Sequence, residues 1–132
     1  VREEINLTCT AFKNDDKEIA QRVAPLGVVI SSLCDELKLH HVERLSDGTC
    51  GLEEGTVFTD ILNCFNRIAT HCASTMVALM QSGEAFQEVH IHNSKVHPTD
   101  TKEYHMYFNE YNQKYDLKTI GKVLSMEPEE VE

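Results

Sequence analysis

Two long stretches of this chain place apolar residues in alternating steps of three and four, and a turn of a few residues separates them. That spacing is typical of an α-helix that packs lengthwise against a neighbouring helix. The first stretch carries the pattern at Ile19, Val23, Leu26, Ile30, Leu33 and Leu37. The second carries it at Phe58, Ile61, Phe65, Ile68 and Cys72, and Leu62, Ala69 and Met76 widen the same face. Because the connection is so short, the two helices must run antiparallel. The sequence therefore predicts an all-α fold, an antiparallel helical bundle.

The other segments fit a single helical domain over residues 1–132. Asp15 followed by Glu18 has the spacing of a capping box that begins a helix, and Asp100 followed by Glu103 repeats it. Gly48 can take the left-handed conformation that ends a helix. In chain order we expect the end of a preceding helix at 1–14, helices at 15–47 and 50–82, a loop at 83–98, a helix at 99–120 and a tail at 121–132.

The charge balance excludes several classes of partner. The chain has 22 acidic and 12 basic side chains, a net charge of −10. Such an excess repels nucleic acid backbones and anionic lipid, so neither is an expected partner. The last helix nevertheless carries a stripe of aromatic residues at Tyr104, Tyr107, Phe108, Tyr111 and Tyr115. With few basic residues beside it, this stripe is interpreted as a core contact rather than a base-stacking surface.

Hydropathy and cysteine usage indicate a cytoplasmic protein. No run of about 18 uninterrupted apolar residues exists, so the sequence predicts no direct membrane insertion of this chain, and its first residues do not resemble a signal peptide. The five cysteines are odd in number and form no C-x-x-C pair, so we expect reduced thiols. Cys64 and Cys72 lie in apolar helical stretches and are expected in the core. A secreted, cytokine-like four-helix domain is a weaker alternative that rests on the Asn6 glycosylation sequon and the cysteines.

Several motifs, in a consistent order, carry a resemblance to a known family. Residues 39–50 read LHHVERLSDGTC, residues 55–62 read GTVFTDIL and residues 67–74 read RIATHCAS. Upstream lie Asn14-Asp15 and Val23-Ala24-Pro25-Leu26, and downstream residues 110–115 read EYNQKY. This series, which covers roughly residues 14–115, is similar to the PhoU-like domains fused after the membrane part of bacterial sodium/phosphate cotransporters.

The resemblance implies a fold, a location and a role. The fold would be a three-helix unit, half of a PhoU fold, completed by oligomerisation into a homo-oligomer. The location would be the cytoplasm, with a tether to the inner membrane through an upstream transporter domain. The role would be regulation of sodium-dependent phosphate transport through protein contacts, with the transporter portion of the same chain or another helical protein surface as the partner.

The resemblance also implies a metal site, which this sequence has largely lost. The family holds metal clusters on E-x-x-x-D patterns, but the corresponding positions here are Asn66 and Thr70. Asp60 and His71 remain at motif positions as candidate metal ligands, yet eleven residues of helix separate them by about 16 Å. We therefore expect no cofactor. The alternative hypothesis is a phosphate-sensing module that binds iron, zinc or nickel through these two residues and the loop histidines His90, His92 and His97.

Sequence motifs of catalysis are absent. The chain contains no G-x-S-x-G, P-loop, H-E-x-x-H or dinucleotide-binding fingerprint. None of its cysteines has a histidine and an acid at a spacing that would predict an activated nucleophile. We therefore expect a regulatory protein and not an enzyme.

Overall fold

A computed structural model of the chain describes residues 1–81 and 101–118, and this part forms four α-helices. They are α1 (Arg2–Asn14), α2 (Lys17–Ser46), α3 (Leu52–Gln81) and α4 (Lys102–Lys114). No strand occurs among the described residues, so the predicted all-α helical bundle is confirmed. Helix α4 ends earlier than the expected residue 120, and the loop expected at 83–98 and the tail expected at 121–132 lie outside the described residues.

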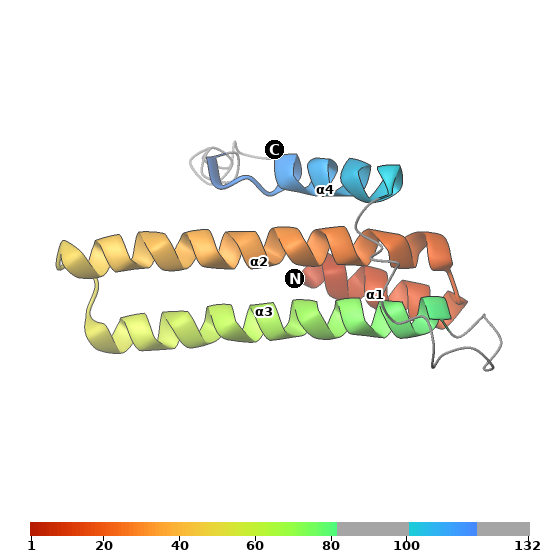
Figure 1. Cartoon of the computed structure of the whole chain (residues 1–132). Helices are drawn as coiled ribbons and strands as arrows, with labels where there is room; N and C mark the ends of the chain where they lie inside the picture. The colour runs from red at the N-terminus through yellow and green to blue at the C-terminus, as the bar shows by residue number, and fades with distance from the viewer. Residues whose placement is uncertain (82–100, 119–132) are drawn as a thin grey trace, which may run out of the picture.

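Helices α2 and α3 form the long antiparallel hairpin on which the other two helices pack (Figure 1). The chain leaves α2 through Asp47, whose backbone N–H donates to the carbonyl of Glu43 at 3.0 Å. Gly48 follows with a φ of 68°, the left-handed conformation that was predicted to end this helix. Among the described helices, none combines the length and the apolar character needed to cross a bilayer.

The predicted helix caps are each one residue too early. Asp15 does not begin α2 but ends α1, in a left-handed conformation with a φ of 52° that Asp tolerates better than most residues. Asp16 is the true N-cap, because its carboxylate accepts a hydrogen bond from the Ile19 backbone N–H at 3.0 Å. Likewise Thr101 caps α4 by accepting from the Tyr104 N–H at 3.1 Å. Neighbouring polar residues compete for such positions, and the path of the incoming chain decides between them.

The α1–α2 corner gives a direct mutational prediction. Asp16→Ala should lower the free energy of unfolding by about 1 kcal/mol, because the Ile19 N–H loses its acceptor. Asp15→Gly is the matched control, since it removes the neighbouring carboxylate at a left-handed position that glycine adopts without strain, and it should not destabilise the chain. Urea denaturation of both variants measures the difference. Equal losses in the two variants would contradict this assignment of the cap.

Two apolar clusters form the core. The first joins α2, α3 and α4, and its buried members are Leu26, Val29, Ile30, Cys34, Leu62, Ala69 and Tyr111. The second joins α1, α2 and α3, and its buried members are Ala11, Ala20, Val23, Cys72, Met76 and Leu79. Helix α1 is short, so it covers only the part of the hairpin that lies farthest from the Asp47–Gly48 turn (Figure 1).

The predicted apolar face of α3 is only partly buried. Leu62, Ala69 and Met76, which were expected to widen this face, are buried as expected and repeat every seven residues. Within the predicted pattern Cys72 is buried, whereas Ile61 is 46% exposed and Phe65 is 39% exposed. Cys64, also expected in the core, is exposed. The predicted face of α3 therefore comprises two adjacent apolar stripes: the one through Leu62 is buried, and the one through Ile61 is partly exposed.

Helix α4 packs on α2 through its aromatic stripe, as expected. Tyr111 is fully buried, and Tyr107 and Phe108 pack around it against the first cluster. The Arg22 guanidinium carbon of α2 lies 5.1 Å from the ring centroid of Tyr107 and reaches Glu110 at 3.4 Å. The stripe thus fixes α4 to the hairpin through burial and through cation–π contacts of Arg22 with Tyr107 and Tyr111.

Candidate functional site

The two candidate metal ligands do not form a site with each other. Asp60 and His71 are both exposed on α3, and the uninterrupted helix between them keeps their backbones about 16 Å apart. Across residues 1–81 and 101–118, no group of three or more His, Cys, Asp or Glu residues is placed to hold an ion. His90, His92 and His97 lie outside the described residues.

Asn66, one of the two residues found in place of the E-x-x-x-D pattern, takes part in a polar contact between α2 and α3. The Ser31 hydroxyl of α2 donates to the side-chain oxygen of Asn66 at 2.5 Å, and the Thr70 hydroxyl donates to the Asn66 carbonyl at 2.9 Å. A shallow depression here is lined by Asn63, Asn66, Arg67, Thr70 and His71. This lining has a guanidinium and no carboxylate, which does not suit a hard cation.

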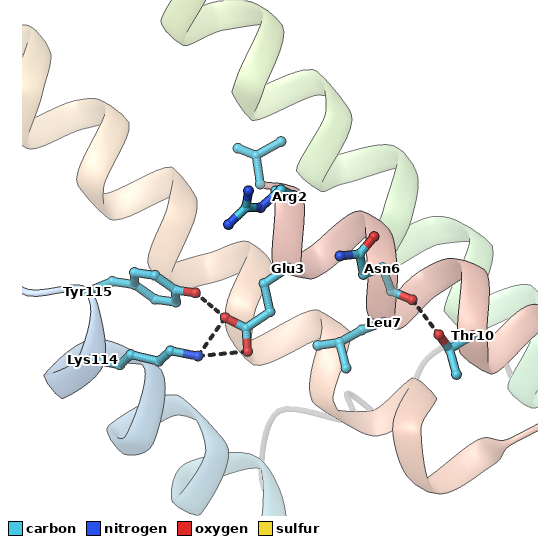
Figure 2. A pocket seen from close by; sticks show the side chains of 8 residues that line it. Arg2, Glu3, Asn6, Leu7, Thr10, Lys114 and Tyr115 are labelled. Carbon is cyan, nitrogen blue, oxygen red and sulfur yellow. Dashed lines mark hydrogen bonds and ion pairs between the residues drawn. The ribbon is translucent and has the colours of Figure 1, made fainter. Parts of the chain in front are cut away.

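A second surface hollow lies where α1 meets α4. The polar residues that line it hold these two helices together. Figure 2 shows Lys114 and Tyr115 pointing at the carboxylate of Glu3. The Lys114 ammonium donates to the two Glu3 oxygens at 2.8 and 3.0 Å, and the Tyr115 hydroxyl donates to one of them. Partial burial raises the pKa of Glu3, but the hydrogen bonds from Lys114 and Tyr115 outweigh it and leave this pKa below its usual value. The contact holds α1 against the end of α4.

Glu4, the residue that follows Glu3, lies in an environment that raises its pKa instead of lowering it. Its side chain is fully buried and faces Gly27 of α2, where an added Cβ would lie 2.9 Å from a carboxylate oxygen and 4.0 Å from the Ala69 side chain. Within the described structure neither carboxylate oxygen has a hydrogen-bond partner. Desolvation raises the pKa of Glu4 to about 7. This group was not identified from the sequence, where an acidic residue in a first helical turn is expected in solvent.

A second buried titratable residue lies near the turn of the hairpin. His41 is 4% exposed, and its ring centroid lies 5.1 Å from that of Phe58. A Cβ added to Gly55 of α3 would lie 2.4 Å from the His41 Nε2, so the absence of a side chain at residue 55 makes room for the imidazole. Its Nδ1 has no partner in the described part of the chain. His41 is therefore a packing residue between α2 and α3.

Part of the second apolar stripe of α3 is open to a partner. Far from the turn, Ile68, Cys72 and Leu79 belong to the cluster that α1 covers with Leu7 and Ala11. Toward the turn the stripe continues where α1 does not reach, through Val57, Ile61 and Phe65. These three side chains are 58%, 46% and 39% exposed, and we refer to them as the open seam.

Exposure of three large apolar side chains in one stripe is characteristic of an interaction surface, whereas single exposed apolar residues are ordinary.

Comparison of the chain with protein-family models, with characterised proteins and with solved structures finds no match. The function is therefore inferred from the geometry and from the sequence motifs.

Proposed function

We propose that this chain is a regulatory accessory domain that acts by binding a helical protein surface through the open seam. The observation that carries the proposal is the half-covered stripe of α3: its far half packs against α1, and its near half exposes Val57, Ile61 and Phe65. A stripe with that spacing is completed when another helix packs on it. The proposal does not include catalysis, because the hollow between α1 and α4 is built around the Glu3–Lys114 contact and the depression at Asn66 has no carboxylate in its lining.

The sequence motifs of residues 14–115 favour one location and one partner for this regulatory domain. Their similarity to PhoU-like domains supports a cytoplasmic domain that regulates sodium-dependent phosphate transport, with the transporter as the partner. Metal-dependent phosphate sensing is the less favoured role, because the distance between Asp60 and His71 prevents them from sharing an ion.

Phosphate uptake tests the proposal. In cells that encode this chain, sodium-dependent phosphate uptake should fall when phosphate is abundant, and Phe65→Asp should abolish that response because an ionised carboxylate blocks apolar docking. Asn63→Asp is the control: it adds the same charge two residues away, on the opposite side of α3 and at an exposed position. A preserved response in the Phe65→Asp strain, with the variant folded and at wild-type abundance, would refute the proposed role.

A further inference from the structure

Helix α1 covers the far half of the second α3 stripe through few buried side chains. Of its 13 residues two are buried, Glu4 and Ala11. Leu7 is partly buried and packs against both core clusters. A helix of this length is marginal in water on its own, so α1 depends on these contacts to stay folded on the hairpin.

One of these contacts is made by a carboxyl group in an apolar site. The buried Glu4 side chain faces Gly27 of α2, and a Cβ added at residue 27 would also lie 4.0 Å from the Ala69 side chain of α3. Neither Glu4 oxygen has a hydrogen-bond partner within the described structure. Because burial of an unpaired charge costs far more than burial of a neutral acid, docking of α1 favours a proton on Glu4.

The charges nearby do not remove this preference. The groups of α2 and α3 that lie closest to the Glu4 carboxyl, Gly27 and Ala69, are uncharged. Within residues 1–81 and 101–118, the charge that acts on Glu4 is the Val1 amino group, which lowers its pKa. Desolvation outweighs this effect and places the pKa of Glu4 at about 7.

The cations of α2 and α4 that lie near the start of α1 act on Glu3 instead. Lys114 donates to both Glu3 oxygens, and the charge of Arg22 also lowers the pKa of this carboxyl group. With a pKa below its ordinary value, Glu3 stays ionised between pH 5 and pH 8. The contact between α1 and α4 is therefore insensitive to pH in the range where Glu4 titrates.

We propose that α1 is a proton-gated cover of the α3 stripe. With Glu4 protonated, α1 stays docked. With Glu4 ionised, α1 leaves the hairpin and exposes Ile68, Cys72 and Leu79, which then form one continuous apolar stripe with the open seam. The inference rests on the proposed function for its consequence, because a partner helix gains a longer docking surface as pH rises.

The size of the effect follows from the two pKa values of Glu4. Below pH 4.5 the group is protonated whether α1 is docked or released, and above about pH 7 it is ionised in both states. Between these limits, each pH unit shifts the equilibrium about tenfold toward the released helix. The total change is at most about 300-fold, and about 70-fold of it falls between pH 5 and pH 8.

The Cys72 thiol reports the release of α1, because it is buried in the cluster that α1 covers. Its alkylation rate is measured between pH 5 and pH 8 by peptide mass spectrometry, in the wild type and in Glu4→Gln. The ratio of the two rates at each pH cancels the intrinsic pH dependence of the thiol. Glu4→Met is a second reference without a carboxyl group, so one unfolded variant does not end the test.

We expect the rate ratio of wild type to either reference to rise about 70-fold from pH 5 to pH 8. Glu3→Gln should show the same rise, because it keeps the Glu4 carboxyl. Hydrogen exchange of the Leu62 amide, which lies in the core of α3 away from α1, should give a ratio that does not change with pH.

A rise of less than about fivefold at Cys72 would overturn the inference. An equal rise at Leu62 would overturn it as well, because the whole bundle and not α1 alone would then be opening. If the Cys72 ratio is flat but Phe65→Asp still abolishes the uptake response, the proton gate is wrong and the proposed role stands.

Discussion

Replacing Glu4 with methionine should make the protein more stable at pH 8. The wild-type side chain is fully buried with neither carboxylate oxygen hydrogen-bonded among the described residues, so at this pH folding must either desolvate a charge or bind a proton. Methionine fills a similar volume without that cost. From the difference between the ordinary pKa of 4.5 and the folded value of about 7, the gain is at most about 3 kcal/mol.

The same group should make wild-type stability depend on pH in a defined direction. The folded chain retains a proton on Glu4 between pH 4.5 and about 7, where the unfolded chain has released it. Stability should therefore fall as pH rises through this window and stay at its lower level above about pH 8. Urea denaturation of the wild type and of Glu4→Gln across this pH range isolates the contribution of Glu4 to the free energy of unfolding, because the variant cannot titrate at this position.

Glu3→Gln is the matched control for Glu4. The pKa of Glu3 is lowered, so its contribution to stability is present above its unfolded pKa and is lost as pH falls through the folded value. Its replacement should destabilise the protein at neutral pH by removing the charge from the contact with Lys114 and Tyr115. If Glu4→Gln and wild type lose stability in parallel between pH 5 and pH 8, Glu4 is not desolvated in the folded chain.

Gly55→Ala should destabilise the protein, although alanine favours a helix over glycine by about 1 kcal/mol. The added methyl group would lie 2.4 Å from the His41 Nε2 and 2.7 Å from its Cε1, and His41 is buried against Phe58. The imidazole must therefore leave its site or push α3 away from α2. Overpacking of this kind costs about 1–3 kcal/mol.

A double-mutant cycle distinguishes this clash from other effects. In a His41→Ala background the extra methyl group has room, so Gly55→Ala should then be neutral or stabilising. The unfolding free energies of the four proteins give the coupling between the two positions. A stabilising Gly55→Ala in the wild-type background would show that His41 does not occupy the space beside Gly55.

The sequence predicted the hairpin because its determinants are local. Apolar spacing within each helix and the left-handed Gly48 act over a few residues, and they were sufficient to predict two antiparallel helices. Periodicity alone does not reveal which neighbour covers a stripe. The whole apolar face of α3 was therefore expected in the hairpin core, whereas Leu62 and Ala69 are buried there and Ile61 and Phe65 are exposed.

The buried polar groups could not be predicted in the same way. Glu4 and Ala11 lie seven residues apart on the buried face of α1, and that spacing is a signal in the sequence, but the charge of Glu4 favoured a solvated interpretation. His40 and His41 are adjacent and so point about 100° apart, and only tertiary packing decides that His41 is the buried one. The metal assignment to Asp60 and His71 remains a prediction.

The solvent exposure of the open seam can be measured directly by methyl NMR in the presence of a soluble gadolinium chelate. Methyl groups that contact solvent relax strongly in its presence, and buried ones do not. The Val57 and Ile61 methyls should relax several-fold faster than those of Val23 and Leu26, which are 0% and 1% exposed. If Val57 and Ile61 are instead as protected as Val23 in the isolated chain, the open seam does not exist and the docking function fails with it.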